Sequence, residues 1–299
     1  MPRVLVIGSA NVDFTVALPR LPSAGETVTN GTLLVNHGGK GANQAVAARR
    51  LGAQARLIGC VGDDASGRAV RAALAAEGVG TDGVATDTAA ATGTALILVD
   101  REGRNQIAVA PGANRALTVG HTRARGDDFA WAEILVASCE VPLEIVRCAL
   151  ELARRRGIPT ILNPAPVPEL GLDFLELVDY LTPNAGEAAR LSGVAGDAAA
   201  AAAALRARGA RCVVVTLGER GVLACGETLL CHIPAFRIDA VDSTAAGDAF
   251  NGALAVAVTE GRQLAAALRF ASAAAAITCT RRGAQVSLPA RGEVERLAG

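Results

Sequence analysis

Short apolar segments followed by polar or glycine-rich turns recur along the chain, and they predict an α/β fold. The predominantly apolar segments at residues 3–7, 55–61, 134–137, 160–162, 178–181 and 211–215 are typical of strands in a parallel sheet. Helical patterns follow at residues 66–77, 143–156, 198–204 and 263–278. Strands that alternate with helices in this way favour a mostly parallel sheet covered by helices.

Two segments depart from this alternation, and we expect them to form a small accessory β-sheet, or lid. Residues 14–36 read as β-structure interrupted by Pro19 and Pro22, and residues 94–110 read as a hairpin around a turn at 100–104. Further strands are expected at 222–225 and 229–233. No repeat or linker divides the chain, so residues 1–299 are interpreted as one α/β domain with an inserted lid.

Composition excludes several classes of partner. The chain is 51% hydrophobic and 19% charged, with a formal net charge of zero, which gives no electrostatic reason to expect binding to nucleic acid or an anionic membrane. No apolar run approaches the length of a membrane span. The seven cysteines contain no C-x-x-C pair, so we expect reduced thiols in a cytoplasmic protein and no cysteine metal site.

A glycine-rich stretch at residues 37–45 surrounds the single lysine of the chain, Lys40. Glycines there allow close approach of a ligand to the backbone, and Lys40 and Asn43 bring hydrogen-bond donors. The stretch is not a Walker A loop, because Gly41 stands where Ser or Thr would follow the Gly-Lys pair. Donors of this kind suit the hydroxyls of a polar small molecule.

A second glycine-containing stretch, residues 242–252, reads as a tight turn that enters a helix. Phe250, Leu254, Ala257 and Val258 form the apolar stripe of that helix. Free backbone N–H groups at a helix N-terminus bind anions, and they would keep Asp248 ionised as a base beside the bound anion. The alternative is that Asp248 is an ordinary helix cap.

Polar side chains also follow two of the expected strands. Asn11 and Asp13 come after the first strand, and Glu140 follows residues 134–137. Ligands of open α/β sheets bind at the carboxyl ends of the strands, although Asn and Asp are more often simple turn residues.

Three motifs in order, at residues 38–45, 184–187 (Asn-x-x-Glu) and 242–248, resemble the signatures of the ribokinase (PfkB) family of carbohydrate kinases. The resemblance extends over essentially the whole chain. It implies a three-layer α/β/α sandwich with a mostly parallel central sheet and a small β-sheet lid. Ser243 replaces the commoner Thr of the family motif but keeps its hydroxyl.

The resemblance implies the ATP-dependent phosphorylation of D-ribose at its 5-hydroxyl. Asp248 would be the base, and the backbone amides of residues 245–248 would form the anion hole. The implied sugar site comprises Asn11, Asp13, Gly39, Lys40, Asn43, Glu140 and Asp248, with lid residues Ala95 and Ile97 covering it. Alternatives are another sugar or nucleoside (fructose, 2-deoxyribose, adenosine) or a catalytically silent sugar-binding regulator.

The resemblance also implies ATP, Mg²⁺, a monovalent cation, usually K⁺, and a homodimer formed through the lid. The implied ATP groove comprises Asn184, Thr216, Leu217, Gly218, Glu219, Arg220, Gly221, Gly247, Asp248 and Ser272. Glu187 would organise Mg²⁺ through water. The implied monovalent-cation site comprises Asp242, Thr244, Thr278, Arg281, Gly283 and Ser287, several of them through backbone carbonyls.

Overall fold

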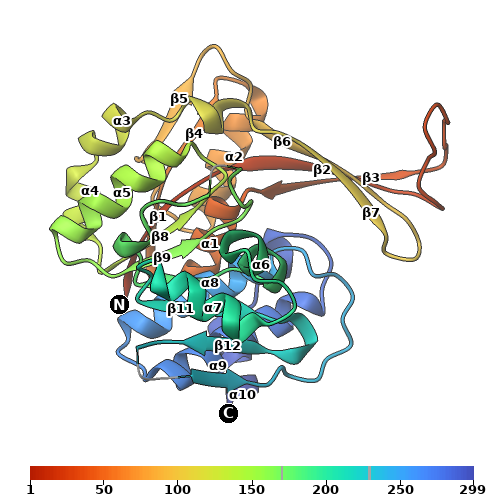
Figure 1. The fold of residues 1–299 in the computed structure, drawn as a ribbon. Coiled ribbons are helices and arrows are strands. Elements are labelled where there is room, and N and C mark those ends of the chain that lie inside the picture. The colour runs from red at the N-terminus through yellow and green to blue at the C-terminus, as the bar shows by residue number, and fades with distance from the viewer. Residues whose placement is uncertain (170, 228–229) are drawn as a thin grey trace.

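A nine-stranded sheet runs through the centre of the computed structural model, which describes residues 1–299 except 170, 228 and 229 (Figure 1). Its order is β13-β12-β11-β10-β9-β8-β1-β4-β5, and all neighbours from β11 to β5 are parallel, whereas β12 and β13 are antiparallel additions. The strands are β1 (Arg3–Ile7), β4 (Gln54–Gly62), β5 (Val84–Asp87), β8 (Ile134–Ser138), β9 (Thr160–Asn163), β10 (Tyr180–Leu181), β11 (Cys212–Thr216), β12 (Val222–Cys225) and β13 (Leu230–Ile233).

Helices cover both faces of this sheet and complete the three-layer sandwich that the sequence predicts. Successive residues of β1 point to opposite faces, so Val4 and Val6 enter one core and Leu5 and Ile7 the other. The first core is closed by α1 (Lys40–Arg50), α2 (Ala65–Ala76), α8 (Ala246–Thr259), α9 (Leu264–Cys279) and α10 (Arg291–Ala298). The second is closed by α3 (Val119–Ala124), α4 (Gly126–Trp131), α5 (Leu143–Arg155), α6 (Ala185–Ser192) and α7 (Ala198–Ala207).

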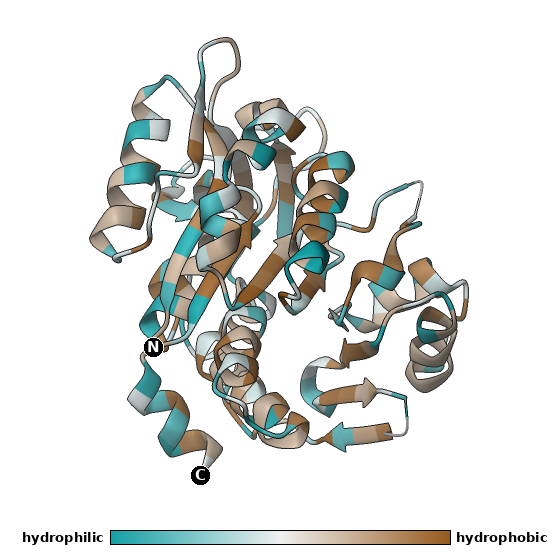
Figure 2. Ribbon diagram, turned by 90° about the vertical axis from the view of Figure 1, so that its left-hand side faces the viewer, coloured by the Kyte–Doolittle hydropathy of each residue, from teal (hydrophilic) through white to brown (hydrophobic). Residues whose placement is uncertain are grey.

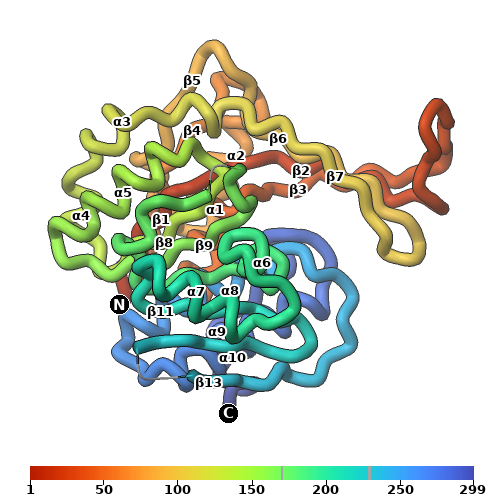
Figure 3. The backbone as a smooth tube through the Cα atoms, in the orientation of Figure 1, coloured from red at the N-terminus to blue at the C-terminus, as the bar shows by residue number. Residues whose placement is uncertain are grey.

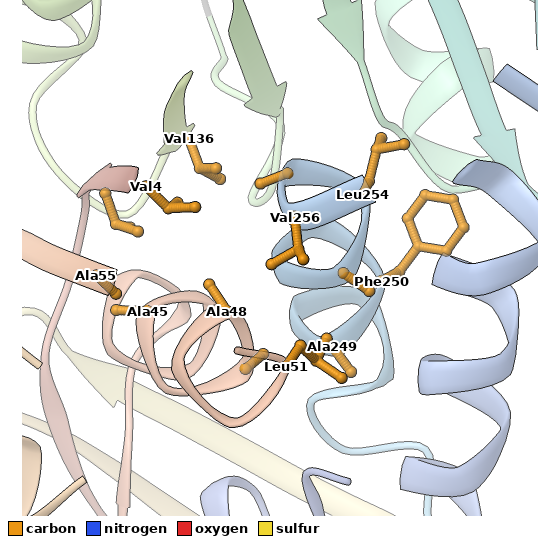
Figure 4. Packing of buried hydrophobic residues seen from close by; sticks show 14 of the residues in the cluster. Val4, Ala45, Ala48, Leu51, Ala55, Val136, Ala249, Phe250, Leu254 and Val256 are labelled. Atoms are coloured by element: carbon orange, nitrogen blue, oxygen red, sulfur yellow. The ribbon is translucent and has the colours of Figure 1, made fainter. Parts of the chain in front are cut away.

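The hydrophobic pattern accounts for this layering. Figure 2 shows the central strands as largely hydrophobic, while the helices carry both hydrophobic and hydrophilic positions. In the first core, Leu51, the C-cap residue of α1, lies next to Ala249 of α8, Ala45 of α1 lies next to Ala55 of β4, and Val4 and Val136 of the sheet belong to the same cluster (Figure 4). Small side chains on α1 and α8 let these two helices come close together, which places the candidate residues of both helices side by side.

The lid is a four-stranded sheet that projects from the body of the molecule, as Figure 3 shows for the segments around β2, β3, β6 and β7. Its order is β3-β2-β6-β7, with β2 and β6 parallel and the outer pairs antiparallel. The strands are β2 (Asn11–Ala17), β3 (Thr32–Gly38), β6 (Gly93–Val99) and β7 (Asn105–Ala110). The lid therefore includes Asn11, Asp13 and Gly38, which extends the expected ranges of 14–36 and 94–110.

Most expected elements are confirmed to within a residue or two. The strand expected at 178–181 is shorter, since β10 spans only Tyr180–Leu181, and Leu229, the expected start of β13, lies outside the described residues. Strand β5, helix α6, the short helices between residues 112 and 131, and the C-terminal α10 were not predicted from the sequence. Among the helices of the described residues, none combines the length and the apolar character that crossing a membrane requires.

Candidate active site

Asp248 lies in the first turn of α8, but it does not cap that helix. The N-cap position is Ala245, which adopts the left-handed conformation (φ 60°, ψ 6°) and provides no side-chain cap. The Asp248 side chain is buried and turns instead toward α1. The interpretation of Asp248 as an ordinary helix cap is therefore wrong, and the buried position of its carboxylate needs another explanation.

Two amide side chains of α1 bind the Asp248 carboxylate. Asn43 Nδ2 donates to Asp248 Oδ2 at 2.9 Å, and Gln44 Nε2 donates to Asp248 Oδ1 at 3.1 Å. Gly252 makes the approach of the two helices possible, because a Cβ at that position would lie 2.9 Å from the Gln44 carbonyl oxygen and 2.7 Å from Ala47 Cβ. The sequence analysis assigned Asn43 to the sugar and missed Gln44 altogether.

The environment of Asp248 makes it a stronger base than an exposed aspartate. Burial raises the pKa of its carboxyl, and the nearby charge of Glu140 adds to the rise. The charge of Lys40 and the two amide hydrogen bonds oppose the rise without cancelling it. The sequence led us to expect the helix N-terminus to stabilise the ionised carboxylate; burial acts in the opposite direction and raises the pKa.

The turn before α8 presents backbone N–H groups, although fewer than the four expected. The N–H of Ala246 donates to the Ser243 carbonyl at 3.2 Å. Among the described residues, no acceptor is found for the N–H groups of Ala245, Gly247 and Asp248. A Cβ at Gly247 would meet nothing within 4 Å, so the space beside this turn is open to an anion.

Two linked, buried hydrogen bonds, which were not predicted from the sequence, hold this turn in place. Asn251 Nδ2 donates to the Gly247 carbonyl at 2.8 Å, and Thr182 Oγ1 donates to Asn251 Oδ1 at 2.7 Å. Both side chains are almost fully buried. Because Thr182 follows β10 directly, these hydrogen bonds fix the first turn of α8 against the carboxyl edge of the sheet.

Lys40 lies at the start of α1, within reach of several acidic groups. Burial lowers the pKa of its ammonium, but the charges of Asp248, Glu140 and Glu187 outweigh that effect, so the net shift is upward and the ammonium stays protonated. Glu140 Oε2 accepts from the Lys40 backbone N–H at 3.1 Å and from the Ser9 hydroxyl. Glu140 therefore anchors the N-terminus of α1, a structural role that the sequence analysis did not predict.

Strand β2 of the lid places Asp13 close enough to Glu140 and Asp248 to interact with both electrostatically. Burial, together with the charges of Glu140 and Asp248, raises the pKa of Asp13 to about 6. Its carboxylate lies against Gly38, where a Cβ would be 2.0 Å from Asp13 Oδ2. Ala95 lies opposite Asp13 in the neighbouring strand β6 and is buried.

Asn11, the first residue of β2, is fixed by a residue that the sequence analysis missed. Asn114 Nδ2 donates to Asn11 Oδ1 at 2.7 Å, and Asn114 Oδ1 accepts from the Ala10 N–H at 2.9 Å. Asn114 lies in the 3-10 helix η1 (Gly112–Ala116) and is almost fully buried. Asn11 and Asp13 are thus lid-strand residues, and the turn-former alternative is wrong.

Most of the residues expected to bind ATP follow strands β10 and β11, and the remaining ones, Gly247, Asp248 and Ser272, lie on α8 and α9. Asn184 and Glu187 form a capping box at the start of α6: the Glu187 N–H donates to Asn184 Oδ1 at 2.9 Å, and the Asn184 N–H donates to Glu187 Oε2 at 2.8 Å. A backbone bridge pairs Asn184 with Thr216. Residues 217–221 then turn through η3 (Gly218–Arg220), and Ser272 lies half-buried on α9.

Glu187 is the candidate for organising Mg²⁺, and its carboxylate lies close enough to Lys40 to interact with it electrostatically. Burial raises the pKa of Glu187, against the hydrogen bond from Asn184 and the charge of Lys40. In the part of the chain that the structure describes, no group of three or more His, Cys, Asp or Glu side chains is arranged to hold a metal. A magnesium ion at Glu187 therefore needs further oxygen ligands from substrate phosphates or water.

The expected cation site is a pair of loops joined by Asp242. Asp242 Oδ1 accepts from the Thr244 N–H and hydroxyl at 2.9 and 2.6 Å, and Oδ2 accepts from the Gly283 N–H at 2.9 Å. Three other side chains of the expected set are already engaged: Thr278 and Ser287 donate to backbone carbonyls, and the Arg281 guanidinium pairs with Glu293. Oxygen ligands suit a hard cation, so these residues fit one through Asp242 and backbone carbonyls.

A separate groove of about 590 Å³ opens at the opposite edge of the sheet, where Pro159, Asp179 and Arg211 precede strands β9, β10 and β11. It contains none of the candidate residues. Parallel sheets bind their ligands at the carboxyl edge, so we place the candidate site around Asp248 and not in this groove.

Comparison with known proteins agrees with this geometry. The model of the pfkB family carbohydrate kinases matches residues 1–291. The chain is 40% identical over 297 residues to a ribokinase of Bacillus subtilis, covering 99% of each chain. It resembles the crystal structure of the Thermotoga maritima ribokinase (36% identity, 99% of each chain, TM-score 0.91). It is equally similar to the structure of Arabidopsis thaliana ribokinase complexed with ribose and ATP (32% identity, 99% of this chain and 98% of that one, TM-score 0.91). The chain therefore belongs to the pfkB family of carbohydrate kinases.

Proposed function

We propose that this kinase transfers the γ-phosphoryl group of ATP to the 5-hydroxyl of D-ribose, giving D-ribose 5-phosphate and ADP. The observation that carries the proposal is the buried Asp248 carboxylate, held by Asn43 and Gln44 next to the open turn at Gly247. Ribokinases of Bacillus subtilis and Arabidopsis thaliana match the full length of this chain, and the latter is complexed with ribose and ATP. Deoxyribokinases of Salmonella, at 35% identity over 96% of this chain, give the 2-deoxyribose alternative weaker support.

In the proposed reaction, Asp248 accepts the proton of the 5-hydroxyl while the hydroxyl oxygen attacks the γ-phosphorus. The bond from the γ-phosphorus to its bridging oxygen breaks, and ADP leaves. The N–H groups of Gly247 and Asp248 stabilise the negative charge on the transferring phosphoryl group, with further help from the start of α8. The Lys40 ammonium adds a positive charge beside the same centre.

The proposed sugar site uses polar groups that the lid and α1 bring together. Asp13 is an acceptor for sugar hydroxyls, while Asn11 has an amide group left to donate once its oxygen is bound by Asn114. A Cβ at Gly39 would lie 2.8 Å from Ala10 Cα, so this glycine lets the Ala10–Asn11 backbone lie close to the start of α1. Asn43 and Glu140 complete the set next to Lys40. Ala95 and Ile97 of β6 cover the site from the lid and exclude water.

ATP is proposed to lie along the residues that follow β10 and β11 and against residues of α8 and α9. The set comprises Asn184, Thr216, Leu217, Gly218, Glu219, Arg220, Gly221, Gly247, Asp248 and Ser272. When bound, Mg²⁺ neutralises charge on the phosphates next to Glu187, and a monovalent cation held at the Asp242 loop keeps the neighbouring turn in shape. Seven free cysteines are consistent with the proposed cytoplasmic location.

The exposed apolar surface of the lid supports a homodimer formed through this sheet. The exposed apolar side chains of the lid strands are Leu33, Leu34, Val35, Leu96, Ile107 and Val109. A sheet with exposed edges and faces of this kind normally needs a cover, and a second lid would provide one.

A coupled assay of ADP release over ribose, 2-deoxyribose, fructose, adenosine and fructose 6-phosphate tests the substrate assignment. We expect the highest kcat/KM on ribose. A clear preference for another member of this panel would replace ribose with that substrate, and no turnover on any of them would favour a sugar-binding regulator.

A further inference from the structure

Gln44 is a buried polar residue that the proposed sugar and ATP sites do not use. It lies on the buried face of α1, whose other buried members are mostly Gly, Ala and Val. Its Nε2 donates to Asp248 Oδ1 at 3.1 Å, whereas its Oε1 is buried without a hydrogen-bond partner among the described residues. A half-satisfied buried amide costs more free energy than an apolar side chain of the same size. Stability alone therefore does not explain a glutamine at this position.

The geometry at Asp248 does explain it. Asn43 binds one carboxylate oxygen and Gln44 binds the other, so the pair fixes the plane of the carboxylate from the side of α1. Each oxygen has a further lone pair available for a proton. We propose that Gln44 is a positioning residue that, together with Asn43, holds both oxygens of the Asp248 carboxylate in the orientation for proton transfer.

We call Asn43 and Gln44, which bind the two oxygens of Asp248, the amide clamp. Its hydrogen bonds predict how substitutions at Gln44 change the pKa of Asp248. The amide stabilises the ionised carboxylate, so the pKa of Asp248 rises when the donor is lost. Gln44→Met keeps the length of the side chain and removes both the donor and the unpartnered acceptor. Gln44→Glu keeps the shape and places a second carboxyl group beside Asp248, which raises its pKa further.

The test measures kcat at saturating ribose and ATP as a function of pH, and it rests on the proposed kinase activity of the wild-type protein. We expect the acid limb of the kcat profile to move up by about one pH unit in Gln44→Met and further in Gln44→Glu. We also expect kcat at the optimum to fall about tenfold in Gln44→Met, with ribose KM changed little. Val46→Ala, a buried change in the same helix that does not touch Asp248, is the matched control.

A second measurement separates failure of this inference from failure of the proposed function. In protein labelled with ¹³C at aspartate carboxyls, Asp248 is assigned by the signal missing from Asp248→Asn, and its pKa is followed without any substrate. An upward shift in Gln44→Met and none in Val46→Ala supports the clamp, whatever the sugar proves to be. An unchanged Asp248 pKa and kcat profile in Gln44→Met would overturn it, as would equal effects of the two variants.

Discussion

The carboxylate of Asp242 accepts a hydrogen bond from the backbone N–H of Gly283 at 2.9 Å, and this bond joins the turn before α8 to the loop after α9. Burial raises the pKa of Asp242, but the hydrogen bonds from Thr244 and Gly283 outweigh it, so the pKa is lowered and the group is anionic at neutral pH. The proposed anion hole at Gly247 follows in the same turn. A cation bound at Asp242 would therefore act on catalysis through the shape of this turn.

We accordingly expect the wild-type enzyme to be several-fold more active in potassium than in sodium buffer of equal ionic strength. Asp242→Asn should lose most of this difference, because a neutral amide is a poorer ligand for a cation. ADP release measured in both buffers checks the prediction. Equal wild-type activity in sodium and potassium would rule out the cation's role.

The raised pKa of Asp13 predicts how sugar binding depends on pH. As the pH falls through about 6, the carboxylate becomes protonated, and it loses its charge and part of its acceptor capacity for sugar hydroxyls. We expect the ribose KM to rise over this range, and the rise to be absent in Asp13→Asn, whose KM is high at every pH. Titration of ribose binding by calorimetry at several pH values measures this directly.

The raised pKa of Asp13 also predicts that this carboxylate, while it helps sugar binding at neutral pH, lowers the stability of the ligand-free protein there. Its folded-state pKa, about 6, lies above the ordinary value of 3.8, so the folded protein binds the proton more tightly than the unfolded chain. The contribution of Asp13 to stability therefore falls as the pH rises from 3.8 to about 6 and stays low above it. Asp13→Asn should raise the Tm of the ligand-free protein at neutral pH and have little effect near pH 4. A lower Tm at neutral pH would contradict this.

Gly38 is a position where substitution should weaken sugar binding, although glycine has no side chain that could bind the sugar itself. A Cβ there would overlap the Asp13 carboxylate, at 2.0 Å from Oδ2 and 2.5 Å from Cγ. Gly38→Ala should displace the carboxylate and raise the ribose KM by about tenfold or more. Gly120→Ala is the matched control, since a Cβ at Gly120 meets only Thr118 Oγ1 at 3.8 Å. Similar KM values in the two variants would refute this view of the Asp13 contact.

The proposed dimer interface on the lid is apolar, so a single charged residue introduced there should separate the two subunits. Val109 is exposed on β7, one of the two edge strands of the lid. A glutamate there would place a charge in the proposed apolar interface, so Val109→Glu should convert the dimer to a monomer. Analytical ultracentrifugation of both proteins at micromolar concentration tests this. A wild-type protein that sediments as a monomer would contradict the proposed dimer.

The sequence predicted the sheet and most of the helices because their signals are local. The buried strand Arg3–Ile7 and the alanine-rich helix Ala198–Ala207 have the periodicity or composition of the element that they form. The helices α3 and α4 have six residues each and carry several polar side chains, too short for a periodic pattern to stand out. Lys40 and the turn at Gly247 could also be identified as candidate site residues from local sequence, because Lys40 is the single lysine of the chain and both lie in stretches that contain glycine.

Pairings between distant segments could not be predicted in the same way. Nothing near Gln44 indicates that its amide meets Asp248, 204 residues away, and Asn114 is 103 residues from Asn11. The available signal for Asn43 and Gln44 was a pair of amide side chains among the small apolar residues 41–48 of α1. Helix capping by Glu140 also depends on tertiary contact, because the N–H that it binds belongs to α1, 100 residues earlier.

The assignment of Asp248 as the base is the central claim, and Asp248→Asn tests it most directly. The amide keeps the size of the side chain but does not accept the proton, so kcat for ADP release on ribose should fall by about a hundredfold or more. Calorimetry should show that ribose and ATP still bind, and Asp239→Asn, at an exposed position, should keep wild-type activity. If Asp248→Asn turns over within about tenfold of the wild-type rate, Asp248 is not the base.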